Sequence, residues 1–188
     1  MEIMPRYRGL LLAAALAALA GCGAPRRPAP PLRSPAPAPG EGVKVTLPGG
    51  AITIADPTGA KLWEASAELI IWEGRSNVAR MSKVDCNFIE GGKAVLSAQA
   101  PQVVAYIGER RVVLSEGVEA RSNVQKASFR ADRMEWAAAD KKVYATGNVK
   151  LVRGPSQATG TRLVADLALR RVRMEGAKGA PVKLLLVE

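Results

Sequence analysis

The sequence of 188 residues contains no histidine, and this absence excludes several kinds of catalytic site. Without an imidazole the chain has no Ser-His-Asp triad, no Cys-His dyad, no histidine metal ligand and no histidine general base. Aspartates such as Asp56, Asp85 and Asp132 are scattered, and the sequence has neither a phosphate-binding loop nor a nucleophile elbow. We therefore expect a protein that is not an enzyme and that uses no cofactor and no metal.

Long hydrophobic runs are also rare, and the longest, Leu10 to Ala20, contains only leucine and alanine. It follows Arg6 and Arg8, which is the layout of a secretory signal. At 1.5 Å per helical residue this run spans about 16 Å, well short of the roughly 30 Å hydrocarbon core of a bilayer. We therefore predict that residues 1–21 are a signal peptide and not a transmembrane helix.

Only two cysteines are present, Cys22 and Cys86. The sequence Leu19-Ala20-Gly21-Cys22 resembles the lipobox of bacterial lipoproteins, which implies cleavage before Cys22 and lipid attachment to its sulfur. Several acyl chains on one residue would hold the protein firmly at a membrane. The alternative is an ordinary secretory signal with an incidental cysteine. With Cys22 lipidated, Cys86 has no disulfide partner, and we interpret it as a half-buried structural residue.

Residues 22–42 are predicted to form a tether after the lipidated cysteine. Seven of the 13 prolines of the chain fall here, interleaved with alanine and with Arg26, Arg27 and Arg33. Such a composition favours extended polyproline II, with a reach of about 60 Å at roughly 3.1 Å per residue. The three arginines would lie near anionic lipid headgroups.

Acidic residues are outnumbered, since 17 Asp and Glu stand against 27 Lys and Arg, for a net charge of +10. This balance indicates an anionic partner: a nucleic acid, a phospholipid surface or a phosphorylated glycolipid. Export from the cytoplasm and the lack of a clustered basic and aromatic platform argue against nucleic acid, which we do not expect as a partner.

From Val43 onward the sequence alternates between apolar and polar residues, as in Val43 to Leu47, Val149 to Arg153 and Val172 to Glu175. Glycine-rich turns separate these runs, which predicts one all-β domain of antiparallel strands over residues 43–188. Residues 131–139 and 162–169 are rich in alanine and leucine. They lie inside repeating units that are strand-like elsewhere, so we predict strands there as well.

The domain repeats at intervals of 31 and then 29 residues, as from Val112 to Val143 and on to Val172. Each unit has an apolar strand, a basic turn and a second strand that runs into a glycine. The three copies centre on Tyr106, Trp136 and Leu167, with turns at Arg110-Arg111, Lys141-Lys142 and Arg170-Arg171, and glycines at 117, 147 and 176. A repeat of about 30 residues indicates stacked hairpin-like units that bury a shared apolar face.

Two segments of this repeat, Ala131 to Trp136 and Val143 to Leu151, resemble the OstA-like lipopolysaccharide-transport proteins. The shared pattern is an Ala-Asp-x-x-x-aromatic strand, a short turn, and a strand that ends in Gly-Asn-Val. Residues 165–166 and 172–176 echo it, and residues 62–68 resemble the first strand of the LptC branch of that family. The resemblance covers roughly residues 43–188. It implies an antiparallel β-jelly-roll, or β-taco, in which two sheets form an open V that holds acyl chains.

The resemblance further implies a lipid-anchored component of lipopolysaccharide export that faces the periplasm. Its implied partners are lipopolysaccharide or a similar anionic glycolipid, an ATP-driven Lpt permease complex, an LptA-like bridge protein and, through the lipid anchor, a membrane. The best-known LptC proteins carry an N-terminal transmembrane helix instead of a lipid. Gly23 stands where enteric bacteria place the aspartate that retains lipoproteins at the inner membrane. We favour the inner membrane over the outer. The alternative is a structural envelope lipoprotein with the same repeat and no lipid cargo.

Apolar residues at matching repeat positions are the candidates for the lining of a lipid groove. They are Val112, Leu114, Val118, Val143, Ala145, Val149, Leu151, Val172 and Met174. The other interpretation is that these residues pack an ordinary core, and the sequence leaves both open. The scarcity of aromatics, 4% of the chain, favours a groove that its own side chains do not fill.

Overall fold

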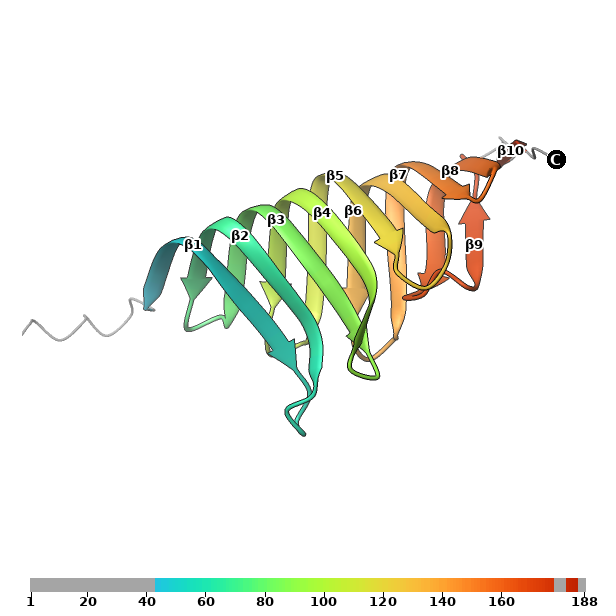
Figure 1. Ribbon diagram of the computed structural model, residues 1–188. Helices are drawn as coiled ribbons and strands as arrows, with labels where there is room; N and C mark the ends of the chain where they lie inside the picture. The colour runs from blue at the N-terminus through green and yellow to red at the C-terminus, as the bar shows by residue number, and fades with distance from the viewer. Residues whose placement is uncertain (1–42, 178–181, 186–188) are drawn as a thin grey trace, which may run out of the picture. The chain divides into compact units, whose positions relative to one another are not determined.

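The computed structural model describes residues 43–177 and 182–185. The predicted signal peptide, the tether and Cys22 lie outside the described residues. The described part is built from strands alone (Figure 1), and no helix in it has the length and hydropathy needed to cross a membrane. The strands are β1 (Lys44–Ala55), β2 (Lys61–Glu73), β3 (Val78–Glu90), β4 (Lys93–Tyr106), β5 (Arg111–Ser122), β6 (Ala127–Ala137), β7 (Lys142–Arg153), β8 (Ser156–Asp166), β9 (Val172–Glu175) and β10 (Lys183–Leu185).

These strands form one antiparallel sheet in which neighbours in sequence are neighbours in space from β1 to β8. Two short strands share the last position, because β9 pairs with Arg162–Ala165 of β8 and β10 pairs with Gln157–Thr159. Strand β1 pairs only with β2 among the described strands. Within the described residues the sheet is therefore not closed and keeps an unpaired edge at each end.

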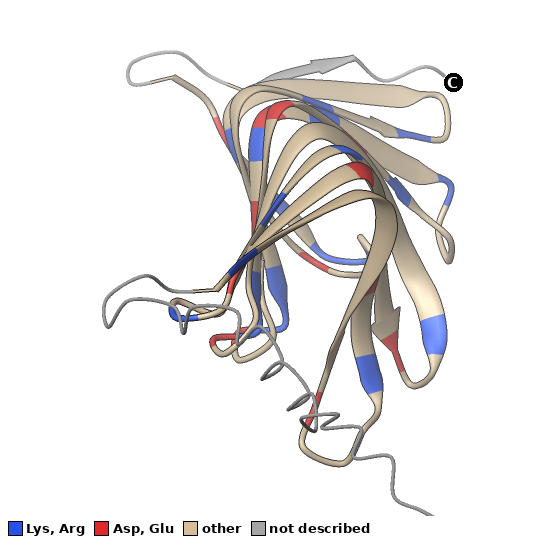
Figure 2. Ribbon diagram, turned by 90° about the vertical axis from the view of Figure 1, so that its left-hand side faces the viewer, with Lys and Arg blue, Asp and Glu red and all other residues tan. Residues whose placement is uncertain are grey.

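The long strands bend in the middle, and the bend divides the sheet into two leaves. Register shifts mark it between Gln99 and Gln102, Ser115 and Val118, Arg130 and Arg133, and Thr146 and Val149. Leaf A comprises residues 50–55, 61–67, 84–90, 93–100, 118–122, 127–131, 149–153, 156–160 and 183–185. Leaf B comprises residues 44–48, 69–73, 78–82, 102–106, 111–115, 133–137, 142–146, 162–166 and 172–175. Figure 2 looks along the sheet and shows the leaves as the two sides of an arch.

The bend keeps one face of each strand directed inward on both leaves. On β6, Phe129 and Ala131 are buried before the bend, and Met134 and Trp136 are buried after it. Strict alternation would turn Met134 outward, and the additional residue at the register shift restores its direction. Both leaves therefore contribute to a single apolar core between them.

The Gly-Asn-Val pattern of the sequence is the bend of β7. Gly147 and Asn148 have φ angles of +76° and +44°, and the Asn148 Nδ2 donates a hydrogen bond of 2.8 Å to the Asp132 Oδ2 on β6. A Cβ at position 147 would lie 2.9 Å from the Asp132 Cβ. Gly147 and Asp132 thus fit together at the bend, which explains why the Ala-Asp strand and the Gly-Asn-Val strand of the sequence pattern occur together.

The predicted all-β, antiparallel, repeat-based β-taco architecture is confirmed, with one difference. The three sequence units are the hairpins β4–β5, β6–β7 and β8–β9, and the alanine-rich stretches 131–139 and 162–169 lie in β6 and β8 and the turns after them. The two sides of the V, however, are leaves of one continuous sheet and not two separate sheets. A strand of 11 to 14 residues is long enough to cross the bend and serve both leaves.

We predict that Gly147→Ala lowers the free energy of unfolding by about 2 kcal/mol, because alanine disfavours a positive φ and its Cβ would meet Asp132. Urea denaturation measures the change. Gly108→Ala is the matched control, since its φ is unstrained and the nearest atom to an added Cβ, the Asn77 Nδ2, is 3.7 Å away. Equal stability of the two variants would contradict this account of the bend.

Candidate lipid-binding interior

All nine candidate groove residues lie in or against the core between the leaves. Val112, Leu114, Val118, Val143, Ala145 and Val149 are at most 1% exposed. Leu151, Val172 and Met174 are half-buried and pack against this core from β7 and β9. The repeat therefore identified inward-facing positions on both leaves.

Three aromatic rings from β2, β3 and β6 form a cluster in the interior. The ring centroids of Trp63 and Phe88 are 6.5 Å apart, and those of Phe88 and Trp136 are 5.3 Å apart in an edge-on arrangement. Trp63 and Phe88 belong to leaf A, whereas Trp136 belongs to leaf B. All three lie near strand ends, far from the bend. We call the line where the strand ends of the two leaves meet the mouth, and this aromatic cluster bridges it.

The prediction that few aromatics leave the interior unfilled is wrong for this conformation. Trp63, Phe88, Phe129 and Trp136 are at most 2% exposed and occupy the core. Composition reports how many rings a chain has but not where they gather. The position of Trp136 at the centre of a repeat could have predicted that its ring faces inward. In the sheet it lies between Val112 and Val143, which are also buried.

The indole nitrogens of Trp63 and Trp136 are buried and have no hydrogen-bond acceptor among the described residues. A buried donor without a partner costs roughly 1–3 kcal/mol of stability. Buried tryptophans in proteins usually find an acceptor for this N–H. The two rings therefore fill space in the core at an energetic cost that a phenylalanine would avoid.

Cys86 lies in the same part of leaf A and is buried. Removal from water raises the pKa of its thiol to about 12, although the indole N–H of Trp63 favours the thiolate. The thiol therefore stays protonated at neutral pH. It packs as a small apolar group, in agreement with the structural role expected for it.

A short loop closes the C-terminal half of the mouth. The strap, residues Leu167–Leu169 between β8 and β9, is at most 5% exposed although it is a loop. The Ser122 Oγ at the end of β5 donates a hydrogen bond of 2.8 Å to the Ala168 carbonyl. From the end of β7, the Arg153 guanidinium donates one of 2.6 Å to the Leu169 carbonyl. The strap thus connects the end of leaf B to the end of leaf A.

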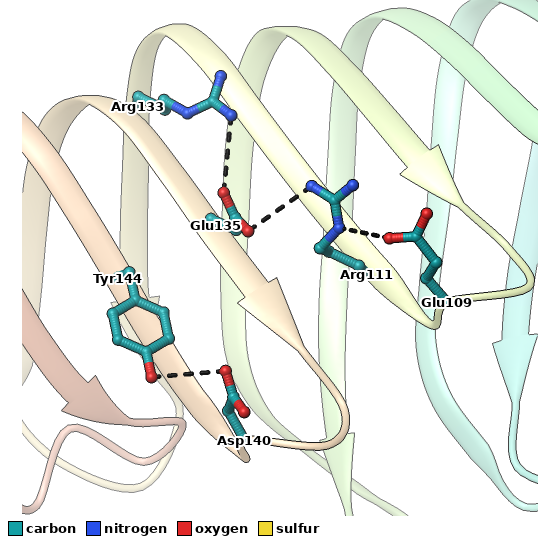
Figure 3. A network of polar contacts seen from close by, with 6 residues as sticks. All are labelled: Glu109, Arg111, Arg133, Glu135, Asp140 and Tyr144. Atoms are coloured by element: carbon teal, nitrogen blue, oxygen red, sulfur yellow. Dashed lines mark hydrogen bonds and ion pairs between the residues drawn. The ribbon is translucent and has the colours of Figure 1, made fainter.

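Ion pairs occupy the outer face of leaf B (Figure 3). Arg111 contacts Glu109 at 2.8 Å and Glu135 at 3.6 Å, and its guanidinium carbon lies 3.8 Å above the centre of the Tyr106 ring. Hydrogen bonding to Glu109 raises the pKa of Arg111 above its ordinary value. Arg111 is therefore engaged within the protein. The basic turn residues that stay exposed include Lys141, Lys142 and Arg170, near the ends of leaf B.

A hollow of about 620 Å³ lies outside the core, on the outer face of leaf A. Outward-facing polar residues such as Asp85, Gln99, Arg121 and Lys150 line much of it. Within the described residues, no group of three or more histidine, cysteine, aspartate or glutamate side chains is placed to hold a metal ion. The candidate groove residues thus lie at the apolar interior, and none of them lines this hollow.

The fold and this interior define a class of protein: an unclosed antiparallel sheet, bent along its middle, whose leaves enclose an apolar space. The family model for lipopolysaccharide-assembly, LptC-related proteins matches residues 11–179, and the chain belongs to this family. Membership gives it a role in lipopolysaccharide transport.

Comparison with solved structures finds LptH, the LptA-homologous periplasmic component of the lipopolysaccharide transport device of Pseudomonas aeruginosa. It is 9% identical, the match covers 79% of this chain and 97% of that one, and the TM-score is 0.34, too low to support an argument. No curated protein matches the sequence.

We predict that Arg153→Ala speeds amide hydrogen exchange of the strap about tenfold, because the loss of hydrogen bonds from a charged donor favours local opening. The Leu169 amide, which donates to the Asp166 carbonyl, is the probe. Arg130→Ala, which removes an ion pair with Glu119 on the outer face, is the control and leaves this rate unchanged. Equal exchange in both variants would mean that Arg153 does not hold the strap.

Proposed function

We propose that the protein carries an acylated, anionic glycolipid such as lipopolysaccharide, with the acyl chains between leaf A and leaf B. The observation that carries this proposal is the open sheet: the leaves share a backbone only at the bend, and side chains and the strap hold the mouth closed. Separating the leaves at the mouth breaks no strand pairing described in the sheet. The fold therefore offers a long apolar interior that opens along one side.

In the described conformation the protein's own side chains fill the interior. To take up lipid, these side chains must replace their contacts with one another by contacts with acyl chains. Transfer of an acyl chain from water contributes about 0.8 kcal/mol per methylene, so about ten methylenes contribute about 8 kcal/mol. Separation of the leaves gives up the packing of the core between them, including the contact of Phe88 with Trp136, and the hydrogen bonds of the strap. The bound chains would take over the contacts with Val143, Val149 and the other candidate groove residues.

The positive charge supports an anionic headgroup at the mouth. Lys141 and Arg170 in turns, and Lys142 at the start of β7, lie at the end of leaf B, where a headgroup would remain in water while its chains enter the interior. Arg111, another of the basic turn residues, is excluded from this role by its contacts with Glu109 and Glu135.

In the full proposal, the Cys22 lipid and the tether of residues 22–42 hold the domain at the envelope, facing the periplasm and preferably on the inner membrane. The domain receives lipid from an ATP-driven permease and passes it to an LptA-like bridge protein. Strand β1 supports end-to-end assembly, since among the described strands it pairs only with β2 and it exposes Leu47. The protein transfers lipid without chemical change, as expected for a protein that is not an enzyme.

A second candidate is a structural envelope lipoprotein that never binds lipid between its leaves. The packed interior favours it, because the aromatic cluster and the strap give the protein a complete core of its own. The two candidates differ in whether a lipid ever contacts an inward-facing residue.

Site-specific photo-crosslinking separates them. With p-benzoylphenylalanine in place of Val143 or Val149, we predict adducts with lipopolysaccharide in cells that produce the full chain, because both residues face the interior. The matched controls are the neighbouring outward-facing positions Tyr144 and Lys150, which should give few adducts. Adducts at the controls but at neither inward position would favour the structural lipoprotein.

A further inference from the structure

Two indole N–H groups inside the core make no hydrogen bond among the described residues, although that of Trp63 is near enough to the Cys86 thiol to favour its thiolate. The Nε1 atoms of Trp63 and Trp136 are buried without an acceptor among the described residues, and the two rings are 0% and 2% exposed. Both rings flank Phe88, one from the same leaf and one from the opposite leaf. The donors therefore lie in one cluster at the mouth and belong to both sides of it.

Packing alone does not account for an indole at these two positions. The same core uses phenylalanine at Phe88 and Phe129, which fill space and leave no polar atom unpaired. Buried polar groups are nearly always hydrogen-bonded, so an unpaired donor in a core calls for a specific explanation. An acceptor supplied by a ligand would provide the missing partner for each N–H.

The surroundings of the donors restrict the chemistry of that acceptor. The residues opposite Trp136 in the sheet are Val112 and Val143, and Trp63 stands opposite Phe88 with the neutral Cys86 thiol nearby. A phosphate or carboxylate would lose its hydration in such a place with only neutral donors in return, which is unfavourable. A carbonyl oxygen is neutral and only accepts hydrogen bonds, so it suits an indole N–H in apolar surroundings.

The depth of the donors fits one part of an acylated lipid. Trp136 lies four residues from Asp132 at the bend, which corresponds to about 13 Å of strand at roughly 3.3 Å per residue. This stretch is apolar on its inner face, where Met134 is buried. Acyl chains that fill it would leave their linkage to the headgroup level with the aromatic cluster.

We infer that Trp63 and Trp136 donate hydrogen bonds to the ester or amide carbonyls through which acyl chains join the headgroup of the lipid. This inference rests on the proposed function and adds to it a recognised chemical group. The indoles would define how deeply the lipid is seated: carbonyls at the cluster, chains toward the bend and phosphates outside with the basic turns.

The test replaces each indole by 3-benzothienylalanine, which keeps the shape of the ring and puts sulfur in place of the N–H. Binding of hexa-acylated lipid A to the full-length protein in detergent is measured for the wild type and for Trp63→3-benzothienylalanine, Trp136→3-benzothienylalanine and both together. We expect about a fivefold loss of affinity for each replaced donor, with unchanged or higher stability to urea. The same replacement at Trp72, which is 36% exposed, should leave the affinity unchanged.

The possible results distinguish this inference from the proposed function. If the wild type binds lipid A and the replaced proteins bind it equally well, the carbonyl inference is overturned and lipid carriage stands. If the wild type does not bind lipid A, the proposed function fails and the inference fails with it. Trp63→Phe and Trp136→Phe supply a second set of donor-free variants should incorporation of the analogue impair folding.

Discussion

The structure depends on a change of strand direction that keeps the same residues inward. A flat antiparallel sheet with one apolar face would need a second layer to cover it. Here each long strand turns at an irregular pair, as at Asp132 and Gly147-Asn148, and the apolar face covers itself. The two leaves form a core without a second sheet, a helix or a disulfide among the described residues, and the edges of the sheet remain free.

This arrangement gives the two long sides of the interior different strengths. At the bend the leaves are joined by continuous backbone, whereas at the mouth they meet through Phe88 against Trp136 and through the strap with Ser122 and Arg153. Opening at the mouth therefore breaks side-chain packing and the hydrogen bonds of the strap, but no strand pairing among the described strands. A carrier of acyl chains needs this asymmetry, because the core must admit its cargo and keep its fold.

Much of the fold could be predicted from sequence because the repeat has a simple physical cause. Val112, Val143 and Val172 recur since each hairpin presents the same face, and the structure confirms their inward direction. The single bent sheet could not be predicted, because alternation looks the same on both sides of Gly147 and a register shift leaves no mark in composition. The contacts that close the mouth could not be predicted from sequence either, since Phe88 and Trp136 are far apart in the chain.

The central claim, that lipid enters between the leaves, is tested most directly by the distance across the mouth. Spin labels at Lys93→Cys, the first residue of β4, and Ala139→Cys, in the turn after β6, report this distance by pulsed electron resonance in a Cys86→Ala background. Both positions are exposed, so the labels leave the core intact. The account predicts that the distance increases when lipid A binds. Bound lipid A with an unchanged distance would contradict it.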